Sequence, residues 1–282
     1  MCALRGCIIA GMYREFFGLK EKPFNVTSDP NFLFLSHIHK EALSHLIYGI
    51  KEKKGFLEIT GEIGAGKTTL CRALLSQLDK NTKTAFIFNS NLPELQLLQS
   101  ILEDFGIIVG RKNKVSLFAQ LNHFLIEEMS HGNNVVLIID EAQNIKTRVL
   151  EEIRMLSNLE TEKEKLFQII LVGQPELKEK LASPELKQLR QRIAVRFHIT
   201  ALEKDDTEKY IYHRLSVAGS SGNIRFYPEA IDYIFSFSGG IPRLINMACD
   251  KALLAAYVAE TKEITLPIVE RSVNELHGMV SV

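Results

Sequence analysis

A glycine-rich run near residue 60 has the composition of a phosphate-binding loop. It reads Gly61-Glu62-Ile63-Gly64-Ala65-Gly66-Lys67-Thr68-Thr69 and fits the spacing G-x-x-x-x-G-K-[ST]. Its glycines let the backbone curl so that N–H groups, together with a helix N-terminus, point at phosphate oxygens. Lys67 then places a cation beside the β and γ phosphates, and Thr68 offers a hydroxyl to Mg²⁺. The run therefore predicts a site for ATP and Mg²⁺.

Two adjacent carboxylates follow the apolar run of residues 135–139. Asp140 fits the carboxylate that holds Mg²⁺ in P-loop enzymes, and Glu141 is placed to polarise a water for attack on the γ phosphate. The alternative is a helix start, where the dipole favours acidic residues. A glutamate in this position favours hydrolysis over phosphoryl transfer to a metabolite, and it argues against a scaffold that binds ATP without turning it over.

Three further side chains are candidates for the same reaction. Gln174 follows the fourth expected strand, where its amide would orient the attacking water; the alternative is an ordinary turn before Pro175. Arg190 and Arg192 precede the fifth strand, and either would reach the γ phosphate of a neighbouring subunit. The alternative for both arginines is a solvated helix surface.

Arg243 is a candidate sensor of the bound nucleotide. It follows Gly239-Gly240-Ile241-Pro242, in which a flexible pair of glycines precedes a proline suited to a first helical turn. That arrangement would bring Arg243 to the γ phosphate of its own subunit, so that a helical lid responds to nucleotide. A helix-surface cation is the alternative.

The elements that must position these residues alternate between strand and helix. Short apolar or β-branched runs separated by helical patterns are typical of a parallel sheet with crossover helices, which gives an α/β fold class. The expected strands are Phe56–Thr60, Lys83–Asn89, Asn134–Asp140, Phe167–Gly173 and Val195–Ile199. The expected helices among them are His37–Lys53, Leu92–Phe105, Val115–His131 and Lys146–Leu159.

The pattern changes after Leu202, where the strand runs stop. Signals for helix starts and ends follow. Asp205 or Asp206 can cap the first helix, and prolines suited to first turns occur at Pro228, Pro242 and Pro267. Glycines suited to helix ends occur at Gly239 and Gly278. We therefore expect residues 12–200 to form the nucleotide-binding α/β domain and residues 201–282 to form a small all-helical lid. Residues 1–11 are interpreted as a non-essential extension.

Composition sets limits on partners and location. Of 282 residues, 46% are hydrophobic and 24% charged, which is near the average for globular proteins and excludes disordered or collagen-like chains. Lys plus Arg (34) equals Asp plus Glu (34), so overall charge neither indicates nor excludes DNA binding. Apolar runs are much shorter than the roughly 18 to 20 residues of a membrane span. We expect a cytoplasmic protein, and peripheral attachment to the inner membrane stays open.

The opening of the chain carries a more specific resemblance. The run Met12-Tyr13-Arg14-Glu15-Phe16-Phe17-Gly18-Leu19, followed by Lys22-Pro23-Phe24, Asp29-Pro30 and Phe34-Leu35-Ser36, resembles the start of the general secretion pathway protein A group of AAA+ ATPases. Four later segments are similar to that group as well: Gly61–Thr69, Ile139–Asn144, Leu171–Leu177 and Gly239–Asn246. The resemblance covers about residues 12–275.

This resemblance implies a fold, an activity and partners. The sheet would have the order 5-1-4-3-2 beside a helical lid, and ATP hydrolysis would drive assembly through ATP-bound homo-oligomers. Protein partners would belong to a membrane or envelope complex. The roles implied for the site match those above, with Gln174 as sensor, Arg190 or Arg192 as the arginine finger and Arg243 as the lid sensor.

Two qualifications follow from the same resemblance. Secretion members continue into a membrane span and a periplasmic region, whereas this sequence stops after the lid, so membrane anchoring is not expected. The chain also resembles, more distantly, AAA+ regulators of DNA transposition. An ATP-switched DNA-binding regulator is therefore the alternative function.

Overall fold

A parallel sheet forms the centre of the larger of two units in the computed structural model. Its strands are hydrogen-bonded in the order β2-β3-β4-β1-β5, which confirms the expected α/β class and order. They are β1 (Phe56–Gly61), β2 (Thr82–Ile87), β3 (Asn134–Ile139), β4 (Gln168–Gly173) and β5 (Ile193–Ile199). Each overlaps its expected strand, although β2 ends before Asn89, a residue outside the described part of the chain.

The structure describes residues 13–27, 29–88, 90–110, 113–157 and 165–280. These residues divide into a sheet unit, formed by His37–Glu62 and Lys67–Ile199, and a helical unit. The helical unit contains residues 13–36, Ile63–Gly66 and the chain from Thr200 onward. The extension expected at residues 1–11 lies outside the described residues.

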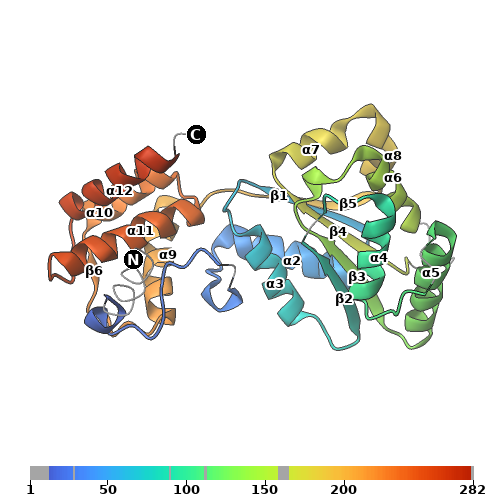
Figure 1. Cartoon of the computed structure of the whole chain (residues 1–282), viewed down its shortest axis with the longest axis horizontal. Helices are drawn as coiled ribbons and strands as arrows, with labels where there is room; N and C mark the ends of the chain where they lie inside the picture. Colours follow the sequence, from blue (N-terminus) through green and yellow to red (C-terminus); the bar gives the residue numbers. More distant parts are fainter. Residues whose placement is uncertain (1–12, 28, 89, 111–112, 158–164, 281–282) are drawn as a thin grey trace, which may run out of the picture. The chain divides into compact units, whose positions relative to one another are not determined.

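Helices cover both faces of the sheet (Figure 1). On one face lie α2 (His37–Lys51) and α3 (Lys67–Gln77), and α2 approaches so closely that a Cβ on Gly49 would overlap the Leu57 side chain. The other face packs in one apolar core against five helices: α4 (Glu94–Asp104), α5 (Lys114–Ser130), α6 (Thr147–Leu156), α7 (Pro175–Ala182) and α8 (Lys187–Arg192). This two-sided burial explains why β3 and β4 are apolar along almost their whole length.

The parallel register brings the ends of three strands to one edge of the sheet. Ile139 of β3 pairs with Leu171 of β4, and Thr60 of β1 pairs with Gly173 of β4. Because parallel strands all point the same way, the loops after β1, β3 and β4 leave the sheet side by side. Those loops carry the glycine-rich run, the two carboxylates and Gln174.

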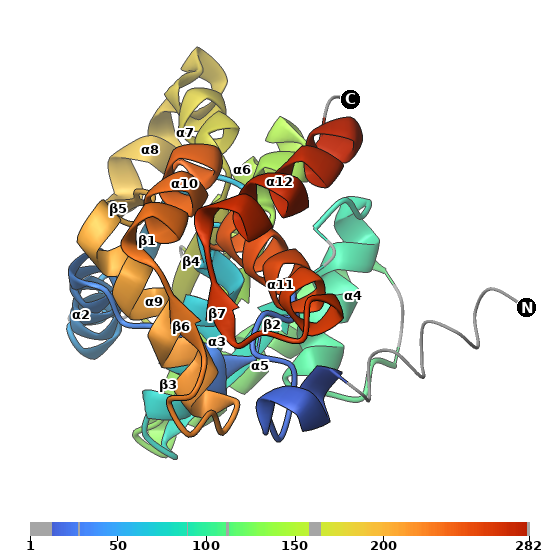
Figure 2. The ribbon, with the colours of Figure 1, turned by 90° about the vertical axis from the view of Figure 1, so that its left-hand side faces the viewer.

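The helical unit contains four long helices and a short parallel ladder. The helices are α9 (Lys204–Val217), α10 (Pro228–Ser238), α11 (Pro242–Val258) and α12 (Leu266–Val280). The strands β6 (Arg225–Phe226) and β7 (Glu263–Ile264) pair beside them (Figure 2). The all-helical prediction is corrected by this ladder, because strands of two residues are too short to leave a periodic signal.

Helix-end chemistry in this unit follows the sequence in part. Pro228 and Pro242 open their helices, and Gly239 ends α10 in the left-handed region at φ +56°, as expected. The expected cap of α9 is wrong: the helix begins at Lys204, so Asp205 lies in the first turn, where the helix dipole still favours its charge. Gly278 lies in the last turn of α12, in agreement with the expected helix end.

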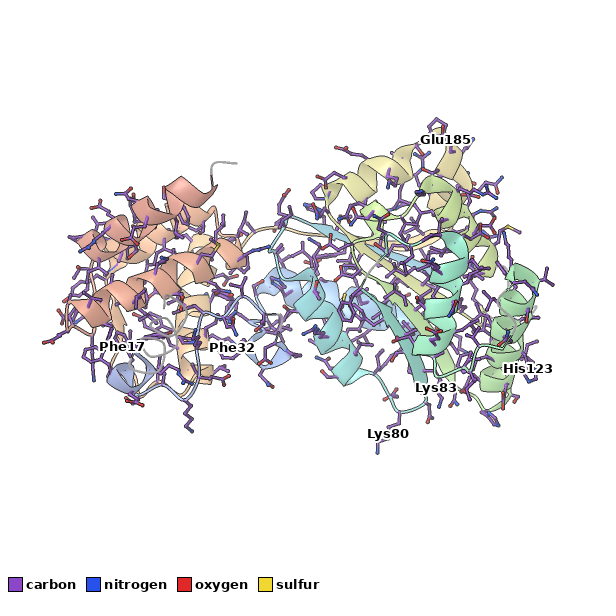
Figure 3. The ribbon with its side chains drawn as sticks, in the orientation of Figure 1. Phe17, Phe32, Lys80, Lys83, His123 and Glu185 are labelled. Carbon is purple, nitrogen blue, oxygen red and sulfur yellow. The ribbon has the colours of Figure 1, made fainter. Side chains whose placement is uncertain are left out.

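The N-terminal segment is packed with the C-terminal helices, which differs from the expected division at residues 12–200. Its buried aromatic residues include Phe17 and Phe32, whereas Lys80 and Glu185 of the sheet unit point outward (Figure 3). A short 3-10 helix, η1 (Pro30–Phe32), is capped by the Asp29 side chain. Aromatic residues of the opening motif are therefore part of the hydrophobic core of the helical unit.

A single buried arginine fixes this segment to α9. The Arg214 guanidinium donates to the backbone oxygens of Pro23 at 2.5 Å and Asn25 at 3.0 Å, and to the Tyr210 hydroxyl at 3.0 Å. It also lies over the Phe32 ring, 4.7 Å from the ring centroid. Buried carbonyls need hydrogen-bond donors, and Arg214 supplies them to a stretch without regular structure.

Arg214→Met is expected to lower the free energy of unfolding of the helical unit by about 2 to 3 kcal/mol, because buried carbonyls lose their donors. Urea denaturation followed by circular dichroism measures the change. Arg271→Met, at an exposed position on α12, is the matched control and should be neutral. Equal stability of the two variants would show that the Arg214 bonds contribute nothing.

Candidate functional site

Glycine is required at the last residue of β1 and at two places in the loop between β1 and α3. Gly64 and Gly66 have φ values of +82° and +95°, in the region that L side chains rarely adopt. Gly61 has a different reason, since a Cβ there would lie 2.7 Å from the Ile199 backbone oxygen. The loop thus has the backbone shape that its motif predicts, and Lys67 begins α3 directly after it.

The Lys67 side chain folds back and contacts the backbone of its own loop. Its Nζ donates to the backbone oxygens of Gly61 at 2.7 Å and Glu62 at 2.8 Å. Burial lowers the pKa of this ammonium, and the nearby carboxylates of Glu141 and Asp140 partly oppose that shift. A buried cation held only by neutral carbonyls and neighbouring acids is well placed to exchange them for an anionic ligand.

Thr68 and Asp140 bring two oxygens together at the edge of the sheet. The Thr68 hydroxyl donates to Asp140 Oδ2 at 2.6 Å. Burial raises the pKa of Asp140, while the bonds from Thr68 and from the Glu141 backbone N–H act in the opposite direction. A hydroxyl and a carboxylate are oxygen ligands of the kind that Mg²⁺ prefers, so the donor set fits the expected metal.

Glu141 sits in an unusual backbone conformation directly after Asp140. Its φ is +52°, in the left-handed region, and its N–H donates to Asp140 Oδ1 at 2.9 Å. The buried Ser90 hydroxyl donates to the Glu141 backbone oxygen at 2.7 Å. Glu141 precedes the 3-10 helix η2 (Ala142–Asn144) but makes no capping bond with its side chain. The helix-start alternative is thus met by the backbone alone: the Glu141 oxygen accepts from the Asn144 N–H at 2.9 Å, while the carboxylate has other partners.

Two glutamine amides meet the Glu141 carboxylate. Gln174 Nε2 donates to Glu141 Oε2 at 3.0 Å, so the structure brings together these two expected site residues. Gln143 Nε2 donates to the same oxygen at 2.6 Å. Gln143 was not singled out by the sequence analysis, although it lies in the segment Ile139–Asn144 that resembles the general secretion pathway protein A group. The available signal was a side chain with both a donor and an acceptor, two residues after Glu141.

The arginines make other contacts. Arg190 Nη1 donates to the Ala182 backbone oxygen at 3.0 Å, and Arg192 Nη1 donates to the buried Ser157 hydroxyl at 2.9 Å. Neither bond involves the carboxylates, so a role in the same subunit is not indicated. In the helical unit, the Arg243 backbone N–H donates to the Gly64 oxygen at 3.3 Å. The roles assigned to these three arginines stay predictions.

The described residues include neither a cluster of metal ligands nor a helix able to cross a membrane. Across residues 13–280, apart from the undescribed gaps, no group of three or more His, Cys, Asp or Glu side chains is arranged to hold a metal. Within the same described ranges, no helix combines the length and the apolar character that crossing a bilayer requires.

Comparison with known families identifies the domain. Residues 50–181 match the family model described as an AAA domain. These residues form a domain with the P-loop AAA-type fold. The matched range contains the loop, both carboxylates and both glutamines, so the geometry of the site belongs to the AAA domain itself.

A sequence relative supports the resemblance seen in the opening motif. General secretion pathway protein A of Aeromonas hydrophila is 42% identical to this chain over 269 residues. The match covers 95% of this chain and 49% of that protein, so the chain spans about half the length of this curated relative. The expected relationship to the general secretion pathway protein A group is confirmed.

Solved structures agree on the fold. Cdc6p of Pyrobaculum aerophilum superposes with a TM-score of 0.67 at 18% identity, covering 86% of this chain and 68% of that one. The ORC2 protein of Aeropyrum pernix, in ADPNP and ADP complexes, gives 0.63 at 17% identity, covering 87% and 69%. At such identities the likeness concerns the AAA fold alone.

Lys67→Ala is expected to weaken ATP binding by at least about 100-fold, because each charge-assisted hydrogen bond to phosphate contributes about 1.5 to 3 kcal/mol. Titration with a fluorescent ATP analogue measures the affinity. Lys80→Ala removes an exposed lysine of the same unit and should bind as the wild type does. Equal affinities for the two variants would remove Lys67 from the nucleotide site.

Proposed function

We propose that this AAA protein binds ATP with Mg²⁺ and hydrolyses it at the carboxyl edge of its sheet. The observation that carries the proposal is the carboxylate of Glu141, which is held by two amides beside the Thr68–Asp140 pair. A base, an oxygen pair suited to a cation and a phosphate-binding loop at one edge are the parts that hydrolysis of a nucleoside triphosphate needs.

Binding would use the loop and the start of α3. Backbone N–H groups of Gly61–Thr69 donate to the phosphate oxygens, and Lys67 exchanges its bonds to Gly61 and Glu62 for bonds to phosphate oxygens. Thr68 and Asp140 would hold the metal. Mg²⁺, when bound, neutralises negative charge on the β and γ phosphates.

Hydrolysis would use the loops after β3 and β4. The Glu141 carboxylate accepts a proton from a water whose oxygen bonds to the γ phosphorus. The bond from that phosphorus to the bridging oxygen of the β phosphate breaks, which yields ADP and inorganic phosphate. Gln174 orients the water from the end of β4, while Arg243 reports the state of the nucleotide to the helical unit.

An arginine from a second copy would complete the site. Arg190 suits this role better than Arg192, because its present bond is to a backbone oxygen at the surface, whereas Arg192 is bonded to the buried Ser157 hydroxyl. The site would then be incomplete in a single copy, so ATP would favour homo-oligomers.

The biological setting follows from the relationship to general secretion pathway protein A. The nucleotide cycle would drive oligomerisation or remodelling in an envelope-assembly or secretion-related process, with protein partners in a membrane complex. The location would be the cytoplasm, with peripheral attachment at the inner membrane. The alternative is an ATP-switched regulator that binds DNA. ATP hydrolysis measured with and without double-stranded DNA tests it.

Glu141→Gln is expected to bind ATP with unchanged affinity but to hydrolyse it about 10² to 10⁴ times more slowly, the usual contribution of a general base. Phosphate release under steady-state conditions measures turnover. Turnover like that of the wild type would remove Glu141 from the mechanism.

The same assay with double-stranded DNA separates the two functions. Hydrolysis indifferent to DNA supports the envelope process, whereas stimulation by DNA supports the transposition-like regulator. The Glu141→Gln protein serves as the blank in both arms.

Arg190→Ala is expected to bind ATP but to lose about 10³-fold or more in turnover, since arginine fingers contribute about 10³ to 10⁵. Mixing it with Glu141→Gln should restore part of the activity, because the mixed interface pairs an intact Glu141 with an intact Arg190. Arg192→Ala is the comparison. Absence of complementation, together with a fully active monomer, would exclude a finger acting between subunits.

A further inference from the structure

Gln143 connects the loop after β3 to the end of β4. The geometry points to Gln143 as the residue that positions the Glu141 carboxylate for the attacking water, an inference that rests on the proposed hydrolysis. Gln143 itself would touch neither the nucleotide nor the water. Its effect would be exerted entirely through Glu141, so it is a positioning residue.

The two ends of the Gln143 amide have different partners. Nε2 donates to Glu141 Oε2 at 2.6 Å, and Oε1 accepts from the Gln174 backbone N–H at 3.1 Å. An ionised carboxylate only accepts and a backbone N–H only donates, so the amide fits in a single orientation. No side chain of similar size without both a donor and an acceptor can replace it.

Gln143 and Gln174 act on the same carboxylate oxygen. Both Nε2 atoms donate to Glu141 Oε2, one from each of two neighbouring strand ends. Two donors at one oxygen fix the rotation of the carboxylate about its terminal bond. We assign the other oxygen, Oε1, to the water.

The surroundings hold Gln143 in its place. Lys180 of α7 donates from Nζ to the backbone oxygen of Gln143, and to that of Ile145 at 2.9 Å. A Cβ on Gly173 would lie 2.8 Å from Gln143 Oε1, so only glycine leaves room for the amide there. These contacts hold both the backbone and the side chain of Gln143 in place, unlike those of an incidental surface glutamine.

Removing the amide should change chemistry and spare binding. In Gln143→Leu, Glu141 keeps its charge and the Gln174 bond but loses one of its two fixed donors. The phosphate loop and the Thr68–Asp140 pair are untouched. We expect kcat to fall about tenfold or more, as a fraction of what a general base contributes, with KM unchanged.

The experiment compares Gln143→Leu with a matched control, Gln99→Leu. Gln99 of α4 also donates its amide to a carboxylate, Glu103, at 2.7 Å, but on the surface of a helix. Kinetics with ATP are measured beside affinity for a fluorescent ATP analogue and for ADP with aluminium fluoride, which mimics the reaction's transition state. Gln143→Leu should bind the analogue normally and the fluoride complex weakly. Gln99→Leu should match the wild type.

Two more variants separate positioning from a structural role. Gln143→Glu keeps the size of the side chain but cannot donate to Glu141, so its kcat should fall at least as much as that of Gln143→Leu. It provides the test if the leucine variant folds poorly. In a Glu141→Gln background, Gln143→Leu should add no further loss, because it acts through Glu141. Losses that multiply in the double variant would overturn the inference.

The outcomes also distinguish this inference from the proposed function. If the wild type and Gln99→Leu release no phosphate from ATP, the proposed hydrolysis fails. If both are active and Gln143→Leu has the same kcat, only the role of Gln143 fails. A rise in KM with constant kcat would assign Gln143 to binding and would likewise overturn it.

Discussion

Parallel pairing of β3 with β4, and of β4 with β1, is the constraint on which the site depends. Parallel strands must be joined by crossover helices, so their carboxyl ends collect at one edge while the connections pass over both faces. The glycine-rich loop, Asp140, Glu141 and Gln174 are far apart in sequence and meet only because of this geometry. The apolar residues of β3 and β4 are buried on both faces, which places these strands at the centre of the sheet.

Burial of the polar groups gives the site its electrostatic character. Desolvation lowers the pKa of Lys67 and raises that of Asp140, so both charged forms are held at a cost in the structure. Phosphates with a divalent cation would relieve both at once, because Lys67 gains an anion and Asp140 gains a cation. The same burial that penalises these two charges therefore favours a ligand with both charges.

Local sequence patterns were sufficient to predict the strands and the phosphate-binding loop, but they could not predict long-range contacts. The apolar runs and the positive φ values of Gly64 and Gly66 follow from neighbouring residues and spacing. Arg214 bonds to Pro23 across 191 positions, so nothing in either segment predicts that the N-terminal part belongs to the helical unit. Gln143 was missed for the same reason: its partner at Gln174 is 31 positions away and depends on sheet order.

The proposed binding and hydrolysis would depend on different parts of the AAA domain. The groups that would hold phosphate and metal lie on the loop before α3, at the start of that helix and at Asp140. Glu141 is oriented instead by side chains after β3 and β4, and Lys180 of α7 fastens the β3 loop. A displacement of α7 would alter the carboxylate and leave the phosphate loop unchanged. Such separation permits a state that holds ATP without cleaving it, which is what a nucleotide-dependent assembly cycle requires.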